Sequence, residues 1–220
     1  MILAVTFKPT DAERGIVAEV VGDLAEASYL TDFDESGRRD ILNRADILLA
    51  RNTGKELRPE ELKIVGKVRL IQFLSAGLDH IPVSQLPRNV LIAKNAGAYA
   101  DPMAEHALAM ALAAAKRLLI EHRNLLRGEF NQFTPNKMLH GRICGIFGFG
   151  GIGAATARLM RCVGMRIHAI NRRGATDDGV DWIGTPDRLD ELVAAADVLI
   201  ISAPLTMTRK RGVILDGSSR

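Results

Sequence analysis

A glycine-rich turn between two apolar runs is the feature that most constrains how this chain of 220 residues can fold. Residues 143–147 form a largely apolar run, which is typical of a strand buried on both faces. Residues 148–153 follow with the spacing G-x-G-x-x-G, then residues 154–163 with apolar side chains at helical intervals, then a second apolar run at 165–170. This strand–turn–helix–strand context predicts a dinucleotide-binding turn rather than a purely structural glycine turn.

The end of the second predicted strand indicates which dinucleotide is bound. A carboxylate is expected about 20 residues after the glycines, where it holds the adenosine ribose hydroxyls. This chain has Asn171 there, followed by Arg172 and Arg173. Asn removes the charge that would repel a 2′-phosphate, and a guanidinium can pair with phosphate through two hydrogen bonds. The sequence therefore favours NADP, with NAD as the alternative if the arginines are only a solvated surface pair.

Composition excludes several other classes of protein. The net charge is only +3, and no dense basic run with interleaved aromatic residues is present, so nucleic acid is not predicted as a partner. The apolar run at 107–115 ends at Lys116 and is too short to span a membrane, and residues 1–5 resemble a strand more than a signal peptide. Cys144 and Cys162 are too few for a zinc site or a disulfide framework. We expect no metal and a reducing, cytoplasmic setting.

Alternating strand and helix patterns predict an α/β fold with parallel sheets covered by helices. A capping box of Thr10 and Glu13 begins one of the first helices. In the first half we expect strands at 2–7, 46–50, 68–74 and 90–93, with helices at 11–22, at 35–44 and from 59–62 onward. After residue 173 we expect a strand at 180–183, a helix at 185–195 and a strand at 198–202.

A long helix is expected to join the two halves. Asp101 is the predicted N-cap, Pro102 lies in the first turn, and Gly128 follows the predicted end near Arg127. The domain boundary is placed just before this helix, at residues 97–100. The predicted domains are residues 1–98, a substrate domain, and residues 99–220, an NAD(P)-binding Rossmann domain that is incomplete.

Several short motifs follow one another along the chain, and they are Ser75–Asp79, Asn95–Gly97, Ala104–His106, Gly148–Gly153, Ala196-Asp197 and Pro204–Thr206. In these motifs and their order the chain resembles the D-isomer-specific 2-hydroxyacid dehydrogenase family, which includes glyoxylate/hydroxypyruvate reductases, phosphoglycerate dehydrogenase and formate dehydrogenase. The resemblance implies two Rossmann-like parallel-sheet domains, of which the first is flavodoxin-like. It disfavours another Rossmann dehydrogenase, such as an alanine dehydrogenase relative.

The resemblance implies a role for particular residues. The backbone amides of Ala76 and Gly77 would bind the substrate carboxylate. Arg51 and Asn52 would lie near the same cleft, with ordinary loop polarity as the alternative. Met103 would face the nicotinamide side, with a core methionine as the alternative. Together with the glycine spacing and the end of the second strand, the resemblance gives the candidate cofactor-binding residues, which are Gly148, Gly150, Gly151, Ile152, Gly153, Asn171, Arg172, Arg173, Ala203, Pro204 and Met103.

The family's catalytic groups are an Arg that orients the substrate, an acid/base His and a Glu that holds the His. All three follow the motif at 204–206, so they are expected beyond the end of this chain, and no catalytic residue is assigned within it. Arg209 and residues 215–220 do not match the family. Among the histidines present, His80 is the best candidate to replace the acid/base His, although a histidine at such a position is more often an ordinary loop residue. The other histidines, His106, His122, His140 and His168, are expected to be structural. We expect a chain truncated at its C-terminus, with the strand at 198–202 left as an edge.

Two hypotheses follow. The first is an NADP-preferring oxidoreductase that reduces a small 2-oxo acid such as glyoxylate or hydroxypyruvate to the 2-hydroxy acid and forms a homodimer through the cofactor domain. The second is a catalytically inactive cofactor-binding fragment. The missing Arg, Glu and His favour the inactive fragment for this polypeptide alone. The glycine turn and the substrate loop indicate that it derives from an oxidoreductase of the first kind.

Overall fold

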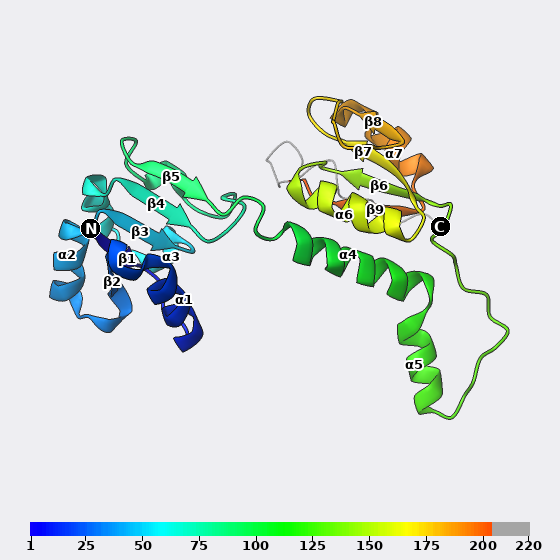
Figure 1. Ribbon diagram of the computed structural model, residues 1–220, viewed down its shortest axis with the longest axis horizontal. Coiled ribbons are helices and arrows are strands. Elements are labelled where there is room, and N and C mark those ends of the chain that lie inside the picture. The colour runs from blue at the N-terminus through cyan, green and yellow to red at the C-terminus, as the bar shows by residue number, and fades with distance from the viewer. Residues whose placement is uncertain (204–220) are drawn as a thin grey trace. The chain divides into compact units, whose positions relative to one another are not determined.

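The computed structural model describes residues 1–203 of the chain. The chain divides into two compact units, Met1–Ala96 and Gly97–Arg220, each built around its own parallel sheet (Figure 1). Among residues 1–203, no helix combines the length and the apolar content that a membrane crossing requires.

The first unit contains a five-stranded sheet in the order β2-β1-β3-β4-β5, in which every neighbouring pair is parallel. This is the flavodoxin-like order expected for the unit. The strands are β1 (Ile2–Val5), β2 (Glu26–Tyr29), β3 (Ile47–Ala50), β4 (Leu70–Phe73) and β5 (Leu91–Lys94), and the helices are α1 (Asp11–Val21), α2 (Glu35–Arg44) and α3 (Thr53–Glu56).

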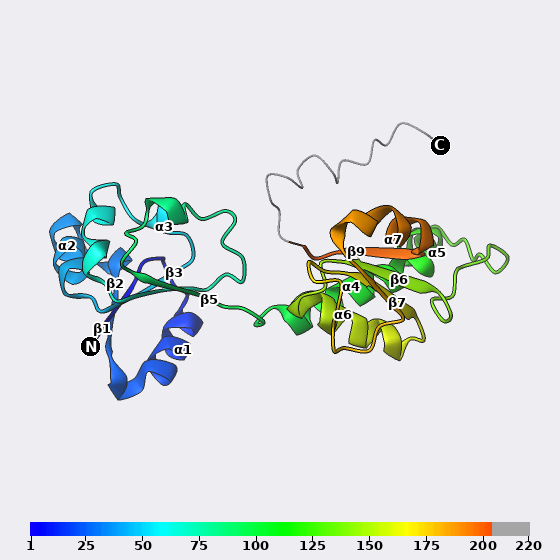
Figure 2. The ribbon, with the colours of Figure 1, turned by 90° about the horizontal axis from the view of Figure 1, so that it is seen from above.

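Side chains of this sheet alternate between two cores because successive residues of a strand face opposite sides. Leu3 and Val5 of β1 pack with Val17 and Val21 of α1, whereas Ala4 between them packs with the core on the α2 side. Figure 2 shows α1 below this sheet and α2 and α3 above it. The predicted capping box of α1 is present, with Thr10 and Glu13 each accepting from the other's backbone N–H, which confirms that helix start.

The helix expected from residue 59 onward is wrong. The segment forms two short 3-10 turns, Glu61–Lys63 and Val65–Lys67, because a tertiary contact overrides the helical propensity of the sequence. Glu61 is 3% exposed and binds the guanidinium of Arg38 from α2 through two bonds, Nε to Oε1 at 2.6 Å and Nη2 to Oε2 at 2.7 Å. This buried pair joins α2 to the segment that leads into β4.

The second unit contains a four-stranded parallel sheet in the order β8-β7-β6-β9. Numbered within the unit this is 3-2-1-4, the first part of the dinucleotide-binding order 3-2-1-4-5-6. The strands are β6 (Ile143–Phe147), β7 (Arg166–Ile170), β8 (Trp182–Gly184) and β9 (Val198–Ile201), and the helices are α4 (Ala100–Ala115), α5 (Leu118–Leu126), α6 (Gly151–Cys162) and α7 (Leu189–Ala195).

Helices cover both faces of this second sheet. Figure 2 shows α7 on one side of the sheet and α6 on the other. Ile146 of β6 packs with residues of α4 and α6, and Phe147 packs with residues of α7. Gly145 faces α7, where a Cβ atom would lie 2.8 Å from the Cβ of Ala196 and 3.2 Å from Leu192. A glycine at this position therefore lets α7 approach the strand closely.

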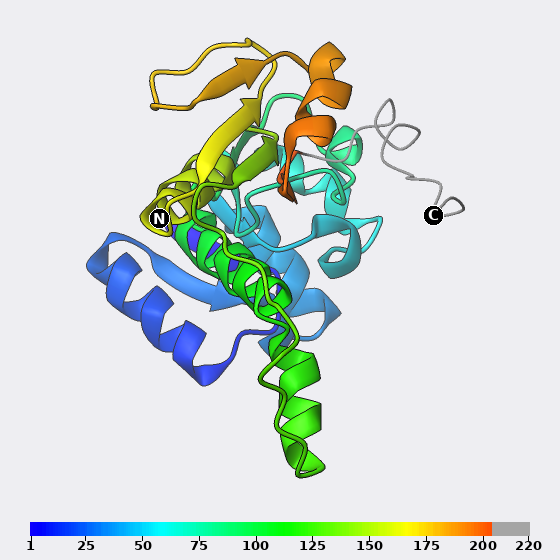
Figure 3. The same ribbon diagram turned by 90° about the vertical axis from the view of Figure 1, so that its right-hand side faces the viewer.

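The single long helix expected from Asp101 to Arg127 is wrong in two respects. Its N-cap is Tyr99, and Asp101 lies inside the first turn, where it forms an ion pair with Arg158 at 3.2 Å. The helix also breaks at Arg117, whose φ of +57° is left-handed and cannot continue a right-handed helix. Figures 1 and 3 show the resulting second helix, α5, extending away from the sheet of its unit. The helix expected at 185–195 is also shorter, because Pro186–Arg188 is a 3-10 turn and α7 begins at Leu189.

Three aspartates fasten the amino ends of the strands. Each directly precedes a strand, and each carboxylate accepts a hydrogen bond from a backbone N–H near the amino end of the neighbouring strand, which would otherwise be unpaired. The bonds are Ile2 N to Asp46 at 2.8 Å, Ile167 N to Asp181 at 2.7 Å and Ile143 N to Asp197 at 2.9 Å.

Candidate cofactor and substrate sites

The turn between β6 and α6 is shaped by two glycines that the fold itself requires. Gly148 has a φ of +103°, and a Cβ atom there would lie 2.4 Å from the backbone N of Ala203. A Cβ atom on Gly153 would lie 2.7 Å from the carbonyl oxygen of Gly148. Internal packing therefore explains the first and third glycines of the G-x-G-x-x-G pattern, in the roles that the sequence predicts for them.

Gly150 and Gly151 have no such internal explanation. A Cβ atom at either position would meet no atom within 4 Å, and Gly150 has an ordinary φ of −110°. Gly150 is the N-cap of α6 and provides no side-chain cap, and no described residue accepts a hydrogen bond from the N–H groups of Gly151, Ile152 or Gly153. The helix therefore presents unpaired N–H groups and its positive dipole end to open space, which suits an anion.

The neighbouring strands hold this turn in place. The N–H groups of Gly148 and Phe149 both donate to the carbonyl oxygen of Ile170, at 3.0 and 2.9 Å. Ser202 donates its Oγ to the Gly148 carbonyl at 2.8 Å, and its N–H to Phe147 at 2.9 Å. Sequence reasoning missed Ser202. The backbone of Ala203 adjoins the turn at Gly148, and its contact with the cofactor stays a prediction. Pro204, which was also expected at the cofactor, lies outside the described residues.

Asn171 and the two arginines after it lie at the carboxyl end of β7, on the strand adjacent to the glycine turn. The Asn171 side chain is engaged by its own loop: Oδ1 accepts from the N–H groups of Arg173 and Gly174, and Nδ2 donates to Ala175 at 2.8 Å. Arg172 and Arg173 are exposed, and neither guanidinium has a hydrogen-bond or ion-pair partner among residues 1–203. Two unpaired guanidinium groups therefore follow the strand where the adenosine ribose is bound in this class of fold.

Met103 lies in the first turn of α4 with 46% of its surface exposed. It is therefore not buried in the core of the second unit, and its place beside the nicotinamide stays a prediction. The buried face of α4 consists of Ala104, Ala107 and Ala111.

The predicted substrate loop begins directly after β4. Ala76 is half-buried and Gly77 is exposed, and no described residue accepts a hydrogen bond from the N–H of either. Ser75 accepts from the N–H of Asn95 at 3.1 Å through its carbonyl oxygen, while its hydroxyl is buried without a partner among residues 1–203. The amides that the resemblance assigns to a carboxylate ligand are therefore free to donate.

Arg51 and Asn52 follow the adjacent strand β3, and both are engaged by other residues. The Arg51 guanidinium pairs with Glu13 and lies over the ring of Phe7, 4.3 Å from its centre. Asn52 is only 8% exposed; its Oδ1 accepts from Gly54 N at 3.0 Å, and its Nδ2 donates to the carbonyl oxygen of His80 at 3.3 Å. One donor and the acceptor oxygen of the Asn52 amide are therefore already engaged within the protein.

The histidines do not form an acid–base pair within residues 1–203. None of the five makes a hydrogen bond or ion pair with a carboxylate there, and His80, the best substitute by sequence, is exposed beside Asp79. His168 packs against Trp182 with ring centres 5.7 Å apart, and burial lowers its pKa. Burial also raises the pKa of the Cys144 thiol to about 12, which makes it a poor nucleophile. No group of three potential metal-ligating side chains occurs in the described part of the chain.

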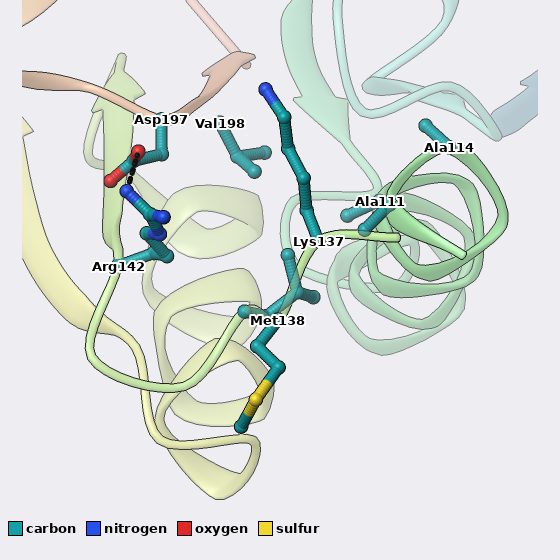
Figure 4. A pocket seen from close by; sticks show the side chains of 9 residues that line it. Ala111, Ala114, Lys137, Met138, Arg142, Asp197 and Val198 are labelled. Carbon is teal, nitrogen blue, oxygen red and sulfur yellow. Dashed lines mark hydrogen bonds and ion pairs between the residues drawn. The ribbon is translucent and has the colours of Figure 1, made fainter. Parts of the chain in front are cut away.

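A cavity of about 390 Å³ lies at the opposite end of the second sheet (Figure 4). Arg142 and Asp197, which border it, precede β6 and β9 and form an ion pair at 3.2 Å. Ligands of open α/β sheets bind outside the carboxyl ends of the strands, whereas this cavity is at the amino ends. This cavity is therefore not at the end of the sheet where such folds bind their ligands.

Comparison with known proteins identifies the class. Residues 108–214 match the NAD-binding domain of the D-isomer specific 2-hydroxyacid dehydrogenases. A glyoxylate reductase of Korarchaeum cryptofilum is 30% identical over 157 residues, which are 67% of this chain and 46% of that protein. A hydroxypyruvate reductase of Thermotoga maritima is 27% identical over 169 residues, which are 76% of this chain and 54% of that protein. The crystal structure of a glycerate dehydrogenase related protein from Thermoplasma acidophilum is 32% identical with a TM-score of 0.64, covering 94% of this chain and 66% of that one.

Two parallel sheets, a glycine turn at a helix N-terminus and these similarities define a dinucleotide-binding α/β protein. The chain belongs to the D-isomer-specific 2-hydroxyacid dehydrogenase family, and its second unit carries the family's NAD-binding domain. The predicted family and fold class are thus confirmed. The chain spans about half the length of the glyoxylate and hydroxypyruvate reductases that it matches.

Proposed function

We propose that this chain binds NADP and a small 2-oxo acid, such as glyoxylate or hydroxypyruvate, as part of a 2-hydroxyacid dehydrogenase. When bound, the reduced nicotinamide would supply a hydride to the carbonyl carbon, and an acid would supply the proton that completes the hydroxyl. The observation that carries the proposal is the open space over Gly150 and Gly151 beside the unpaired N–H groups of residues 151–153. The two cysteines are free, in keeping with a reducing, cytoplasmic setting.

The chemistry of the turn fits a pyrophosphate. Three consecutive N–H groups at an uncapped helix N-terminus can donate to phosphate oxygens without any cationic side chain. The absence of side chains at 150 and 151 lets those oxygens reach hydrogen-bond distance of the backbone. Ser202 and Ile170 fix the turn through the carbonyl and N–H of Gly148, so the amides are held in one direction before the ligand arrives.

The preference for NADP over NAD rests on the loop after β7. Asn171 places no charge there and uses its amide to form the turn at 173–175. Arg172 and Arg173 have no ion-pair partner among residues 1–203, so a 2′-phosphate would not have to displace an existing carboxylate. NAD lacks the 2′-phosphate and would not make this interaction with the arginines. If Arg172 and Arg173 contact only solvent, the chain should show no preference between NADP and NAD.

The substrate assignment rests on the loop after β4. Unpaired N–H groups at Ala76 and Gly77 can bind the carboxylate common to glyoxylate and hydroxypyruvate. The names of the relatives, glyoxylate reductase and hydroxypyruvate reductase, support this class of substrate. Ordered donors for a carboxylate would position the neighbouring carbonyl for hydride transfer.

The alternative, a cofactor-binding chain without catalysis, is favoured by one observation: within residues 1–203, none of the five histidines forms a hydrogen bond or ion pair with a carboxylate. Measuring NADPH oxidation with glyoxylate separates the two. Turnover by the purified chain would establish the first function and show that the proton donor lies within it. Binding of NADPH without turnover would support the second.

A homodimer through the second unit is also part of the proposal. Helix α5 has no buried residue, and its apolar side chains are exposed together with those of the segment that follows it. Exposed apolar surface on this scale is typical of a protein interface. Analytical ultracentrifugation should show a dimer, and Leu119→Glu should dissociate it, while Val20→Glu in the first unit should not. The exposed apolar side chains of this region are Leu118, Leu119, Ile120, Leu125, Leu126, Phe130, Phe133 and Met138.

A further inference from the structure

Glu56 joins two loops at the carboxyl end of the first sheet. Its Oε2 accepts hydrogen bonds from the hydroxyl of Thr6 at 2.6 Å and from the N–H of Arg51 at 3.1 Å. Its Oε1 accepts from the N–H of Asn52 at 2.9 Å. Thr6 follows β1, and Arg51 and Asn52 follow β3, so a single carboxylate fixes the ends of two adjacent strands. Hydrogen bonds to a carboxylate are stronger than those between neutral groups.

Asn52 extends this network to the substrate loop after β4. While Glu56 holds the backbone of Asn52, the side chain caps α3 through Gly54 N and donates to the carbonyl oxygen of His80 at 3.3 Å. The same two segments are in close contact at Gly54, where a Cβ atom would lie 2.6 Å from Cγ of Pro82. The end of the substrate loop is therefore held against α3 by a polar bond and by packing.

The substrate loop has few restraints of its own. At its start the carbonyl oxygen of Ser75 accepts from Asn95 N at 3.1 Å, and at its end the N–H of Ile81 donates to Leu78 at 3.0 Å. Between them, the N–H groups of Ala76 and Gly77 bond to no described residue. The direction of these two amides consequently depends on how each end of the loop is held.

We propose that Glu56 and Asn52 are positioning residues of the carboxylate-binding loop: Glu56 fixes Asn52, and Asn52 fixes the loop through His80. This inference rests on the proposed function, because it gives that loop the substrate carboxylate as its ligand. Neither side chain contacts the ligand. Their effect is to keep the Ala76 and Gly77 amides directed at one point, which lowers the entropy cost of binding.

Two variants separate this role from simple stabilisation of α3. Asn52→Asp keeps the Oδ1 that caps Gly54 but replaces the donor to His80 with an oxygen that repels the carbonyl. Glu56→Gln keeps the shape of the side chain but places an amide NH₂ against backbone donors. Glu60→Gln is the matched control, because Glu60 is exposed and has no side-chain hydrogen bond or ion pair within residues 1–203.

Three quantities are measured: amide hydrogen exchange at residues 75–80, the affinity for glyoxylate and the affinity for NADPH. Glyoxylate binding is monitored through the ¹⁵N shifts of Ala76 and Gly77. Both variants should speed exchange in the loop and weaken glyoxylate binding by about tenfold, a size typical of losing one hydrogen bond to a charged group. NADPH affinity should not change. Glu60→Gln should match the unmodified chain in all three.

Unchanged loop exchange in Asn52→Asp would overturn the inference, and so would unchanged exchange in a folded Glu56→Gln. If Glu56→Gln does not fold, Asn52→Asp alone decides. If the unmodified chain binds no glyoxylate, the substrate part of the proposed function fails, while faster loop exchange in the variants would still establish that these residues hold the loop.

Discussion

The two units each present free backbone amides in a glycine-containing turn at the carboxyl end of a parallel sheet, yet they hold those amides in different ways. In the second unit the turn is fixed by main-chain geometry: Gly148 fits only because it lacks a Cβ atom, and its backbone bonds to Ile170 and Ser202. In the first unit the loop containing Gly77 is held from outside by side chains, through Glu56 and Asn52. The support of the turn in the second unit could be predicted from the spacing of its glycines, whereas the side-chain contacts that support the loop in the first unit could not.

The largest effect is expected in the first unit, where a buried ion pair supports the sheet. Arg38→Ala leaves the carboxylate of Glu61 buried without its partner and should cost about 3–5 kcal/mol of unfolding free energy. Thermal unfolding should show the loss in the transition of the first unit only, with NADPH binding retained. An equal loss of NADPH binding would contradict the independence of the two units.

The same pair predicts a pH dependence. Burial alone would raise the pKa of Glu61, but hydrogen bonds from the Arg38 guanidinium and the Arg58 N–H outweigh it and hold the pKa below its ordinary value of 4.5. A carboxylate whose pKa is lower in the folded than in the unfolded protein stabilises the fold at pH values above its unfolded-state pKa. This contribution is lost as the pH falls through the folded-state pKa. Stability of the first unit should therefore fall below about pH 4.5, and Glu61→Gln should remove this component of the pH dependence.

Gly148→Ala should have the next largest effect, this time in the second unit. The positive φ and the close approach of Ala203 should together cost about 2–4 kcal/mol and disrupt the turn. NADPH binding should be lost, as measured by fluorescence titration. A variant of normal stability and affinity would show that main-chain geometry does not hold this turn.

Gly150→Ala is the matched variant in the same turn. No atom lies within 4 Å of the added Cβ, so the melting temperature should stay the same. The methyl group should nevertheless hinder the pyrophosphate and weaken NADPH binding by about tenfold, equivalent to about 1.4 kcal/mol. If Gly150→Ala binds NADPH normally, the open space over the turn is not where the ligand lies.

The smallest effect is expected from Arg172→Ala. Loss of one exposed guanidinium–phosphate contact should weaken NADPH binding about fivefold and leave NADH binding unchanged. Arg123→Ala, on the exposed surface of α5, is the control for a general change of charge. Tighter binding of NADH than of NADPH by the unmodified chain would refute the argument from the two arginines.

The difference between the units also explains what the sequence could predict. The glycine spacing, the capping box of Thr10 and Glu13, and the apolar runs of the strands act locally, and each predicted its element. The 3-10 turns after Pro59 form where Glu61 contacts Arg38 of α2, so they could not be read from propensity. Nothing in the helical pattern of the sequence predicted the left-handed conformation of Arg117 either. The Ala-Asp pairs before β3 and β9 mark the start of a strand, because each aspartate accepts a hydrogen bond from the backbone of the neighbouring strand.

The candidate site residues also divide into those set by local sequence and those set by tertiary contacts. Gly148 and Gly153 occupy the positions expected from their spacing. Asn52 was expected near the substrate cleft, and the structure adds that its amide is bonded to Gly54 and His80. Glu56 was missed altogether, since its importance lies in bonds to residues up to 50 positions away in the sequence.

The most direct test is an NMR titration of the ¹⁵N-labelled chain with NADPH. The account predicts large shifts at the amides of Gly151, Ile152 and Gly153, a smaller response at Arg172 and Arg173 that NADH does not reproduce, and no change at Ala76 or Gly77 until glyoxylate is added. Saturable NADPH binding that leaves the amides of residues 151–153 unmoved would contradict it.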